Sequence, residues 1–424
     1  MTERTERNPF FTLIFAKLNM RPFQYGFSCE FLPAADVLEL GVPEAMKEHQ
    51  FGLFLKVFDE DLNDDLAALL GALRGLDAYE QFFPWPLLKV EDGYYPNELT
   101  VEKFSKQVAK LLDWLAARGF DPPPYVLVDL EPSADPADAQ KAEAVRADQL
   151  RALRKRLKRE VESAAKEARA PGGAVGGGSG GGEAGGFDAM AFVGKLVDMI
   201  DENMDEERFE ESSRKFDALV EQMHERGTKA LAVALPWTFE DLADGRHLVQ
   251  DFMTTPIQTV NWDAINYMVF STDFVNRTRG VVTHDDFCHL VHSWAKDFAA
   301  HHGQERASIC FGITNYGVQD VSAVQTDPEL YRREFDAAIA GGINQLGIYA
   351  LEGVYASHDD PSRFFEVVGS ASGKFEPEPD KLDFASMIRR LFRALDFVAP
   401  VLKYLVDSGK VMRIIQAVTG GGLL

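Results

Sequence analysis

Short apolar runs alternate with longer amphipathic segments along most of the chain. Each run is six to nine residues long and rich in Phe, Val, Ile, Leu and Tyr, which is typical of strands buried on both faces. The runs predict eight strands, at Phe23–Phe31, Phe51–Phe58, Gln81–Leu88, Tyr125–Leu130, Ala230–Pro236, Ala264–Phe270, Ser308–Ile313 and Gln345–Leu351.

Several segments between these runs carry apolar residues three and four positions apart, the spacing of an amphipathic helix. They predict helices at Asp61–Leu76, Thr100–Arg118, Arg208–Arg226, His284–His301 and Pro328–Ala340. Strands that alternate with helices in this way indicate a parallel (β/α)8 TIM barrel. An open doubly wound sheet is the alternative, but the G-x-G-x-x-G fingerprint expected after its first strand is missing.

Two segments interrupt the alternation. Asp135–Ala170 has helical spacing and many charged residues, and it runs into Ala170–Gly186, in which fourteen of seventeen positions are Gly, Ala or Pro. We therefore expect an inserted helix and a Gly-rich linker after the fourth strand, with the linker dispensable for folding because it has little apolar surface to bury. Gly177–Gly181 matches G-x-S-x-G, but its glycine flanks do not provide the strand and helix of a nucleophile elbow.

The segment from Asp380 onward predicts a C-terminal extension of two amphipathic helices interrupted at Pro400. We expect the first of them to be the last barrel helix and the second to pack on the barrel or bind a partner. The predicted division is a first barrel half at 1–132, the insertion at 133–190, a second barrel half at 191–379 and the C-terminal helices at 380–424.

The composition narrows the range of partners. The formal net charge of −23 repels phosphate backbones and anionic lipids, so we expect neither nucleic acid nor a membrane as a partner. Three widely separated cysteines do not form a disulfide pattern. Phe10–Ala16 is too short and wrongly flanked for a secretory signal. We expect a cytoplasmic protein by default, or a secreted one if a leader is missing; no oligomeric state is indicated.

The fourth predicted strand ends in two carboxylates, Asp129 and Glu131. Residues two apart on a strand point to the same face, here the barrel mouth where such enzymes hold their active sites. Two neighbouring carboxyls separate in pKa, and we expect burial and the Asp129 charge to raise the pKa of Glu131 so that it serves as a general acid. Glycoside cleavage uses this arrangement. The alternative is a hydrogen-bonded structural Asp129 beside a solvated Glu131.

These residues resemble the chitinase-like glycoside hydrolases of family 18, whose fourth strand ends in D-x-x-D-x-D-x-E. The resemblance runs from Phe23 to Gly353 without the insertion, through Arg118-Gly119-Phe120-Asp121, Asp129-Leu130-Glu131, Tyr267–Phe270, Phe311–Gly317 and Gly347–Gly353. It implies a TIM barrel in which Glu131 is the general acid and base and Asp129 tunes it. It also implies a β-linked N-acetylglucosamine polymer or a peptidoglycan-type glycan as substrate.

The sequence departs from this family at four positions. The two earlier aspartates of the motif fall on Pro124 and Leu127, and the family's Tyr-Asp pair on the sixth strand falls on Phe270 and Ser271. Phe270 has no hydroxyl to orient a substrate acetamido group. Asp273 would replace the missing acid if the sixth strand carries a bulge.

Further candidates lie at the predicted strand ends. Flat aromatic rings can cover pyranose faces, and spare carboxylates can contact sugar hydroxyls or act as a second catalytic carboxylate. The residues assigned to substrate binding on these grounds or by the resemblance are Glu30, Trp85, Trp237, Asn315, Tyr316, Tyr349 and Glu352. Barrel packing is the alternative for each ring.

We expect no metal and no cofactor. His284, Cys288 and His292 share one helix flank, but their spacing lets at most two of them bind one zinc ion. Thr283 and Asp286 would cap that helix instead.

The sequence therefore supports a glycoside hydrolase-like enzyme acting on an oligo- or polysaccharide. The alternative is a non-catalytic, lectin-like barrel, favoured by the departures at Pro124, Leu127, Phe270 and Ser271. A third reading is a scaffold whose inserted basic helix and C-terminal helix recruit partners.

Overall fold

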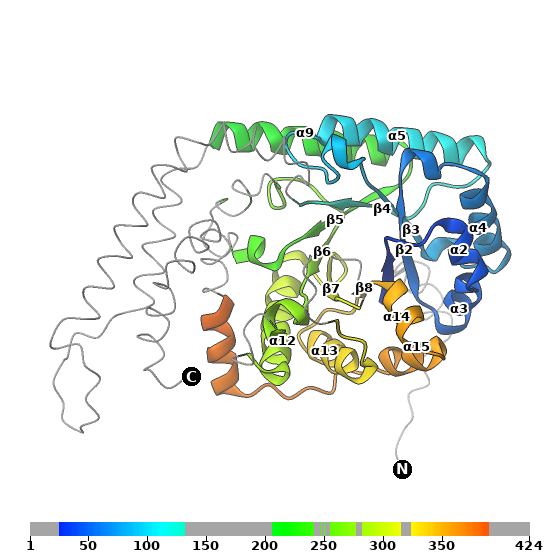
Figure 1. Ribbon diagram of the computed structural model, residues 1–424. Coiled ribbons are helices and arrows are strands. Elements are labelled where there is room, and N and C mark those ends of the chain that lie inside the picture. The colour runs from blue at the N-terminus through cyan, green and yellow to red at the C-terminus, as the bar shows by residue number, and fades with distance from the viewer. Residues whose placement is uncertain are drawn as a thin grey trace, which may run out of the picture.

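A computed structural model describes residues 25–131, 206–240, 247, 250, 255–276, 282–314 and 324–389. Eight parallel strands form one sheet in the order β3-β2-β1-β8-β7-β6-β5-β4, and β3 lies against β4, so the sheet curls into a nearly closed (β/α)8 barrel (Figure 1). The strands are β1 Tyr25–Cys29, β2 Gly52–Val57, β3 Phe82–Pro86, β4 Tyr125–Asp129, β5 Lys229–Ala234, β6 Ala264–Met268, β7 Ala307–Gly312 and β8 Leu346–Tyr349.

The helices lie outside the strands. They are α2 Ala34–Glu39, α3 Val42–His49, α4 Asp64–Gly75, α5 Val101–Ala117, α9 Glu206–Glu225, α12 His284–His302, α13 Pro328–Ala340, α14 Leu351–Ser357 and α15 Pro361–Gly369. All eight predicted strands and all five predicted helices are confirmed to within a few residues at each end. The (β/α)8 prediction is therefore correct.

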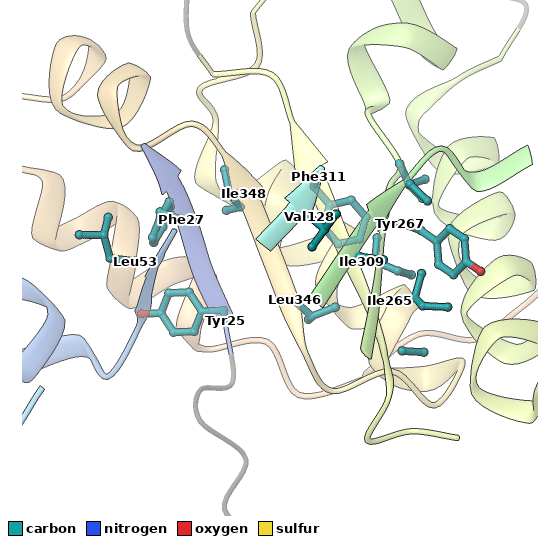
Figure 2. Packing of buried hydrophobic residues seen from close by; sticks show 14 of the residues in the cluster. Tyr25, Phe27, Leu53, Val128, Ile265, Tyr267, Ile309, Phe311, Leu346 and Ile348 are labelled. Atoms are coloured by element: carbon teal, nitrogen blue, oxygen red, sulfur yellow. The ribbon is translucent and has the colours of Figure 1, made fainter. Parts of the chain in front are cut away.

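Two hydrophobic layers hold the barrel together. The larger lies between the strands and the helices, and Figure 2 shows strand side chains in it, among them Tyr25, Phe27, Ile309 and Ile348. The smaller fills the barrel interior with Phe54, Phe83, Trp85, Leu87, Leu127, Leu231, Val233, Ala264 and Met268. Alternate strand residues supply the two layers, as the period of a strand requires.

The helix that completes the barrel differs from the one predicted. After β8 the chain forms α14 and α15, and α15 packs against α13 and α3. Its apolar face, Phe364, Phe365 and Val368, is buried, and the Asp360 side chain accepts from the Ser362 N–H at its start. Residues 379–389, the described part of the predicted C-terminal helices, are therefore not the last barrel helix, because α15 already occupies that place.

Residues 379–389 form a helix joined to the rest by a buried ion pair. The Arg389 guanidinium donates to Glu240 at 2.6 Å and to Asp297 at 2.6 Å, while the Trp294 indole donates to the same Glu240 oxygen at 3.0 Å. This links the C-terminal helix to α12 and to the segment after β5.

The predicted inserted helix, the Gly-rich linker and the tail from 390 onward lie outside the described residues. The three cysteines are free thiols, and all are buried. None of the helices in the described ranges combines the length and the apolarity that a membrane crossing requires.

Candidate functional site

Asp129 is the last residue of β4 and only 3% exposed. It follows Leu127, which packs in the barrel interior, by two positions, so its side chain points the same way. Glu131 lies just beyond the strand and is partly buried; its N–H donates to the Asp129 carbonyl at 3.2 Å. The strand thus ends with one buried and one more accessible carboxyl.

Burial raises the pKa of Asp129 well above its usual value, and the charges of Glu131 and Glu30 raise it further. The Trp85 indole acts in the opposite direction, although neither its Nε1 nor Asp129 Oδ1 has a partner with hydrogen-bond geometry. Asp129 therefore keeps its proton to higher pH than an exposed aspartate does. The raised pKa expected for Glu131 stays a prediction.

Glu30 lies directly after β1 and is 7% exposed. Its Oε1 accepts a hydrogen bond from the Tyr94 hydroxyl at 2.5 Å, and its Oε2 accepts one from the Tyr349 hydroxyl. Glu30 is therefore an acceptor at both oxygens, and the two tyrosines fix its orientation.

Glu352 contacts the backbone after β1 through one carboxylate oxygen. Its Oε1 accepts from the backbone N–H groups of Glu30 at 2.6 Å, Phe31 at 2.6 Å and Leu32 at 3.4 Å. These contacts fix the segment that follows β1. Glu352 therefore holds Glu30 in place through the backbone.

The aromatic residues predicted to bind substrate lie in different layers of the barrel. Trp85, 5% exposed, lies in the barrel interior with its ring centroid 6.5 Å from that of Tyr349. Trp237 belongs to the layer between strands and helices. Asn315 and Tyr316 lie outside the described residues. Trp85 and Tyr349 are thus the pair that the structure brings together.

The aromatic residue that follows β6 is Phe270, whose ring carries no hydroxyl. Phe270 stacks on Tyr349 with centroids 6.0 Å apart, and the Ser271 hydroxyl donates to the Gly312 carbonyl at 3.5 Å. Asp273 is placed in the helical turn Thr272–Asn276 that follows β6. The position where the family has a tyrosine is therefore an apolar ring packed on the tyrosine of β8.

Tyr94 and Tyr95, which follow β3, were not among the predicted site residues. Burial raises the pKa of both phenols; Glu30 is the next cause for Tyr94 and Glu131 for Tyr95. The two rings meet edge to face with centroids 4.8 Å apart. The sequence offered one clue to them. Two adjacent tyrosines follow the turn glycine Gly93 in the loop after the predicted strand Gln81–Leu88.

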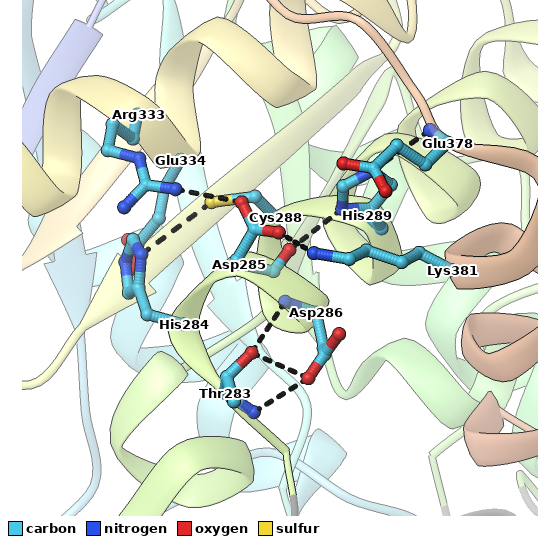
Figure 3. A network of polar contacts seen from close by, with 10 residues as sticks. All are labelled: Thr283, His284, Asp285, Asp286, Cys288, His289, Arg333, Glu334, Glu378 and Lys381. Atoms are coloured by element: carbon cyan, nitrogen blue, oxygen red, sulfur yellow. Dashed lines mark hydrogen bonds and ion pairs between the residues drawn. The ribbon is translucent and has the colours of Figure 1, made fainter.

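The flank of α12 does not form a metal site. His284 Nε2 lies 3.0 Å from the buried Glu334 carboxylate, and Cys288 Sγ lies 3.8 Å from His284 Nδ1 (Figure 3). Burial, with the charge of Glu334, raises the pKa of the Cys288 thiol to about 12, so it stays protonated. Within the described residues, no three His, Cys, Asp or Glu side chains are placed to hold a metal ion.

The capping prediction for the same helix is confirmed. The Thr283 hydroxyl accepts from the Asp286 N–H at 3.2 Å, and the Asp286 carboxylate accepts from the Thr283 N–H at 3.0 Å. This is a reciprocal capping box.

No protein-family model and no curated protein matches the chain. Similar solved structures include D-allulose 3-epimerase from Methylomonas sp., with 10% identity over 82% of this chain and 95% of that one and a TM-score of 0.37. A GH5_18 protein from Bifidobacterium longum, in complex with Manβ1-4GlcNAc, has 10% identity over 86% and 77% and a TM-score of 0.41. An endo-β-1,4-mannanase from Thermotoga petrophila has 10% identity over 85% and 80% and a TM-score of 0.32. TM-scores and identities this low do not support a functional argument, so a function is argued from the residues of the site.

Proposed function

We propose that this protein is a glycoside hydrolase in which Glu131 is the general acid and base. The observation that carries the proposal is the position of two carboxyls at the carboxyl end of a barrel strand. Asp129 there is buried and has a raised pKa, and Glu131 follows it two residues later. Active sites of (β/α)8 enzymes lie at this end.

The pair suits proton transfer to a glycosidic oxygen. Asp129 is buried and Glu131 is more accessible, so Glu131 is the group that reaches a substrate, while Asp129 shares its proton. Because each charge disfavours the other, one proton stays on the pair over a wide pH range. Glu131 protonates the leaving oxygen and later removes a proton from water.

The substrate we propose is a β-linked glycan that contains N-acetylglucosamine. The resemblance of the sequence to family 18 supports this sugar, and the Trp85 and Tyr349 rings supply apolar surface near the carboxylates. A non-catalytic carbohydrate-binding barrel is the second candidate, because Leu127 packs in the barrel interior where the family motif has an acid.

The test is the Glu131→Gln variant, which keeps the size of the side chain and removes its proton chemistry. We expect kcat/KM on 4-methylumbelliferyl β-chitotrioside to fall by on the order of 10² or more. Binding of chitotetraose, followed by calorimetry, should persist.

The matched control is Glu80→Gln, an exposed glutamate, which should hydrolyse the substrate at the unmodified rate. Unchanged hydrolysis by Glu131→Gln would contradict the assignment of the acid. Glycan binding without hydrolysis by the unmodified protein would favour the lectin-like candidate.

A further inference from the structure

Glu30 is held more tightly than a carboxylate that merely contacts solvent. Tyr94 and Tyr349 donate to its two oxygens from different parts of the barrel, 64 and 319 residues away in sequence. Glu352 fixes the Glu30 backbone through its N–H at 2.6 Å. Two segments, the one with Tyr94 and the β8–α14 stretch with Tyr349 and Glu352, thus fix the side chain and the backbone of Glu30, which is the support that a reacting group needs.

The backbone at Tyr94 is in a sparsely populated conformation. Its φ is +62°, in the left-handed region that most non-glycine residues avoid. Its carbonyl accepts from the Leu88 N–H at 2.9 Å and its N–H donates to the Lys89 carbonyl at 3.2 Å, which hold it there. Strain of this kind persists where the surroundings enforce it and clusters at functional sites.

Glu30 lies within electrostatic range of the proposed acid pair. Its charge contributes to the raised pKa of Asp129, and the charges of Glu131, Asp129 and Glu30 act together on Tyr95. The Trp85 indole lies beside the same buried carboxyl and partly offsets the effect of burial on the Asp129 pKa.

The side chain that would allow the substrate's own acetamido group to react is missing. Phe270 carries no hydroxyl and packs on the Tyr349 ring at 6.0 Å, while the Tyr349 hydroxyl is turned to Glu30. The hydroxyl of the β8 tyrosine therefore binds the Glu30 carboxylate.

We propose, on the basis of the function proposed above, that Glu30 is the catalytic nucleophile. Its carboxylate attacks the anomeric carbon as the bond to the leaving oxygen breaks, and Glu131 gives its proton to that oxygen. A glycosyl ester forms on Glu30. Glu131 then takes a proton from water, whose oxygen attacks the anomeric carbon, and the electron pair of the ester bond returns to Glu30.

The mechanism is tested with 4-nitrophenyl β-chitobioside and the Glu30→Ala variant. We expect kcat/KM to fall by on the order of 10³ or more, since no nucleophile remains. Sodium azide should restore turnover and give the α-glycosyl azide, because azide enters the space of the missing carboxylate from the same face. Proton NMR distinguishes this product from the β-azide.

Glu131→Gln, assayed beside it, separates this mechanism from the proposed function. Activity of Glu30→Ala within tenfold of the unmodified protein, with Glu131→Gln impaired, overturns the role of Glu30 and leaves the hydrolase proposal standing. Unmodified rates in both variants overturn both.

A second variant covers the case in which Glu30→Ala does not fold, as judged by circular dichroism. Tyr94→Phe keeps the ring and removes one donor to Glu30. We expect kcat to fall about tenfold with little change in KM, since orientation of the nucleophile matters in the transition state. An unchanged kcat in a folded Tyr94→Phe protein overturns the proposal.

Discussion

Asp129 shows how the environment of one side chain decides its chemistry. Burial disfavours its charged form, and the neighbouring charges of Glu131 and Glu30 act in the same direction. The folded protein therefore binds a proton at Asp129 that the unfolded chain releases at lower pH. Because the folded state binds this proton more tightly, its stability decreases as pH rises above the usual pKa of 3.8.

We predict that Asp129→Asn moves the alkaline limb of the kcat/KM profile to lower pH. In the unmodified pair, each charge disfavours the other, so the pair loses its last proton at higher pH than Glu131 alone would; Asn carries no charge and removes this repulsion. The measurement is a pH profile on the chromogenic chitobioside. Asp121→Asn, at an exposed aspartate, should leave the limb in place.

Urea unfolding provides a readout for Asp129→Asn that needs no substrate. Because the folded-state pKa is raised, the unmodified protein loses stability as pH rises above 3.8, and the variant lacks that loss. As pH rises above 3.8, Asp129→Asn should therefore become increasingly stable relative to the unmodified protein. A constant difference across this range would show that Asp129 is not buried with a proton.

At the scale of elements, α12 and α13 approach each other closely at Gly341. A Cβ atom there would lie 2.6 Å from the Ala295 Cβ and 2.8 Å from the His292 carbonyl oxygen. Neither of these atoms can rotate away, so any larger residue has to move a whole helix. The glycine after α13 thus sets the distance between two helices that cover β7.

We predict that Gly341→Ala destabilises the protein by about 1–3 kcal/mol, the usual cost of overpacking. The matched control is Gly71→Ala. Gly71 lies on the exposed side of α4, where an added Cβ meets nothing within 4 Å. That substitution should stabilise by about 0.5–1 kcal/mol, because alanine favours helix. Urea unfolding of both variants checks the opposite signs; equal effects would refute the packing argument.

At the scale of the whole molecule, the last turn of α12 is joined to the back of β6 by a neutral histidine. His302 Nε2 lies 2.9 Å from the Tyr267 hydroxyl. Burial, together with the charges of His301 and Arg306, lowers the pKa of His302 to about 4. Since the unfolded histidine titrates near 6.5, the unfolded chain binds more protons between these two values.

We predict that the free energy of unfolding decreases as pH falls from 6.5 to about 4, by at most about 3 kcal/mol from this group. His302→Gln retains an acceptor for Tyr267 and does not titrate, so its loss over the same range should be smaller. Urea unfolding at pH 7 and pH 4.5 compares the two proteins. Parallel losses would mean that other groups govern acid unfolding.

The sequence by itself determined the strands, the main helices and the barrel. An unbroken apolar run such as Ile309–Phe311 indicates a strand that is buried on both faces, and it is buried in the structure. The cap of α12 needs only Thr283 and Asp286, which are three residues apart. These features depend on neighbours along the chain, which periodicity records directly. The position of Asp129 at a strand end followed in the same way.

Tertiary structure alone decided how deeply each carboxyl is buried and what surrounds it. Closing the barrel buries Asp129 and leaves Glu131 more accessible, and it brings Tyr94 and Tyr349 to Glu30 across 64 and 319 residues. It also turned Glu352 to the backbone and gave the last barrel position to α15. The pKa of a carboxyl depends on burial and on charges distant in sequence, and no local pattern encodes either.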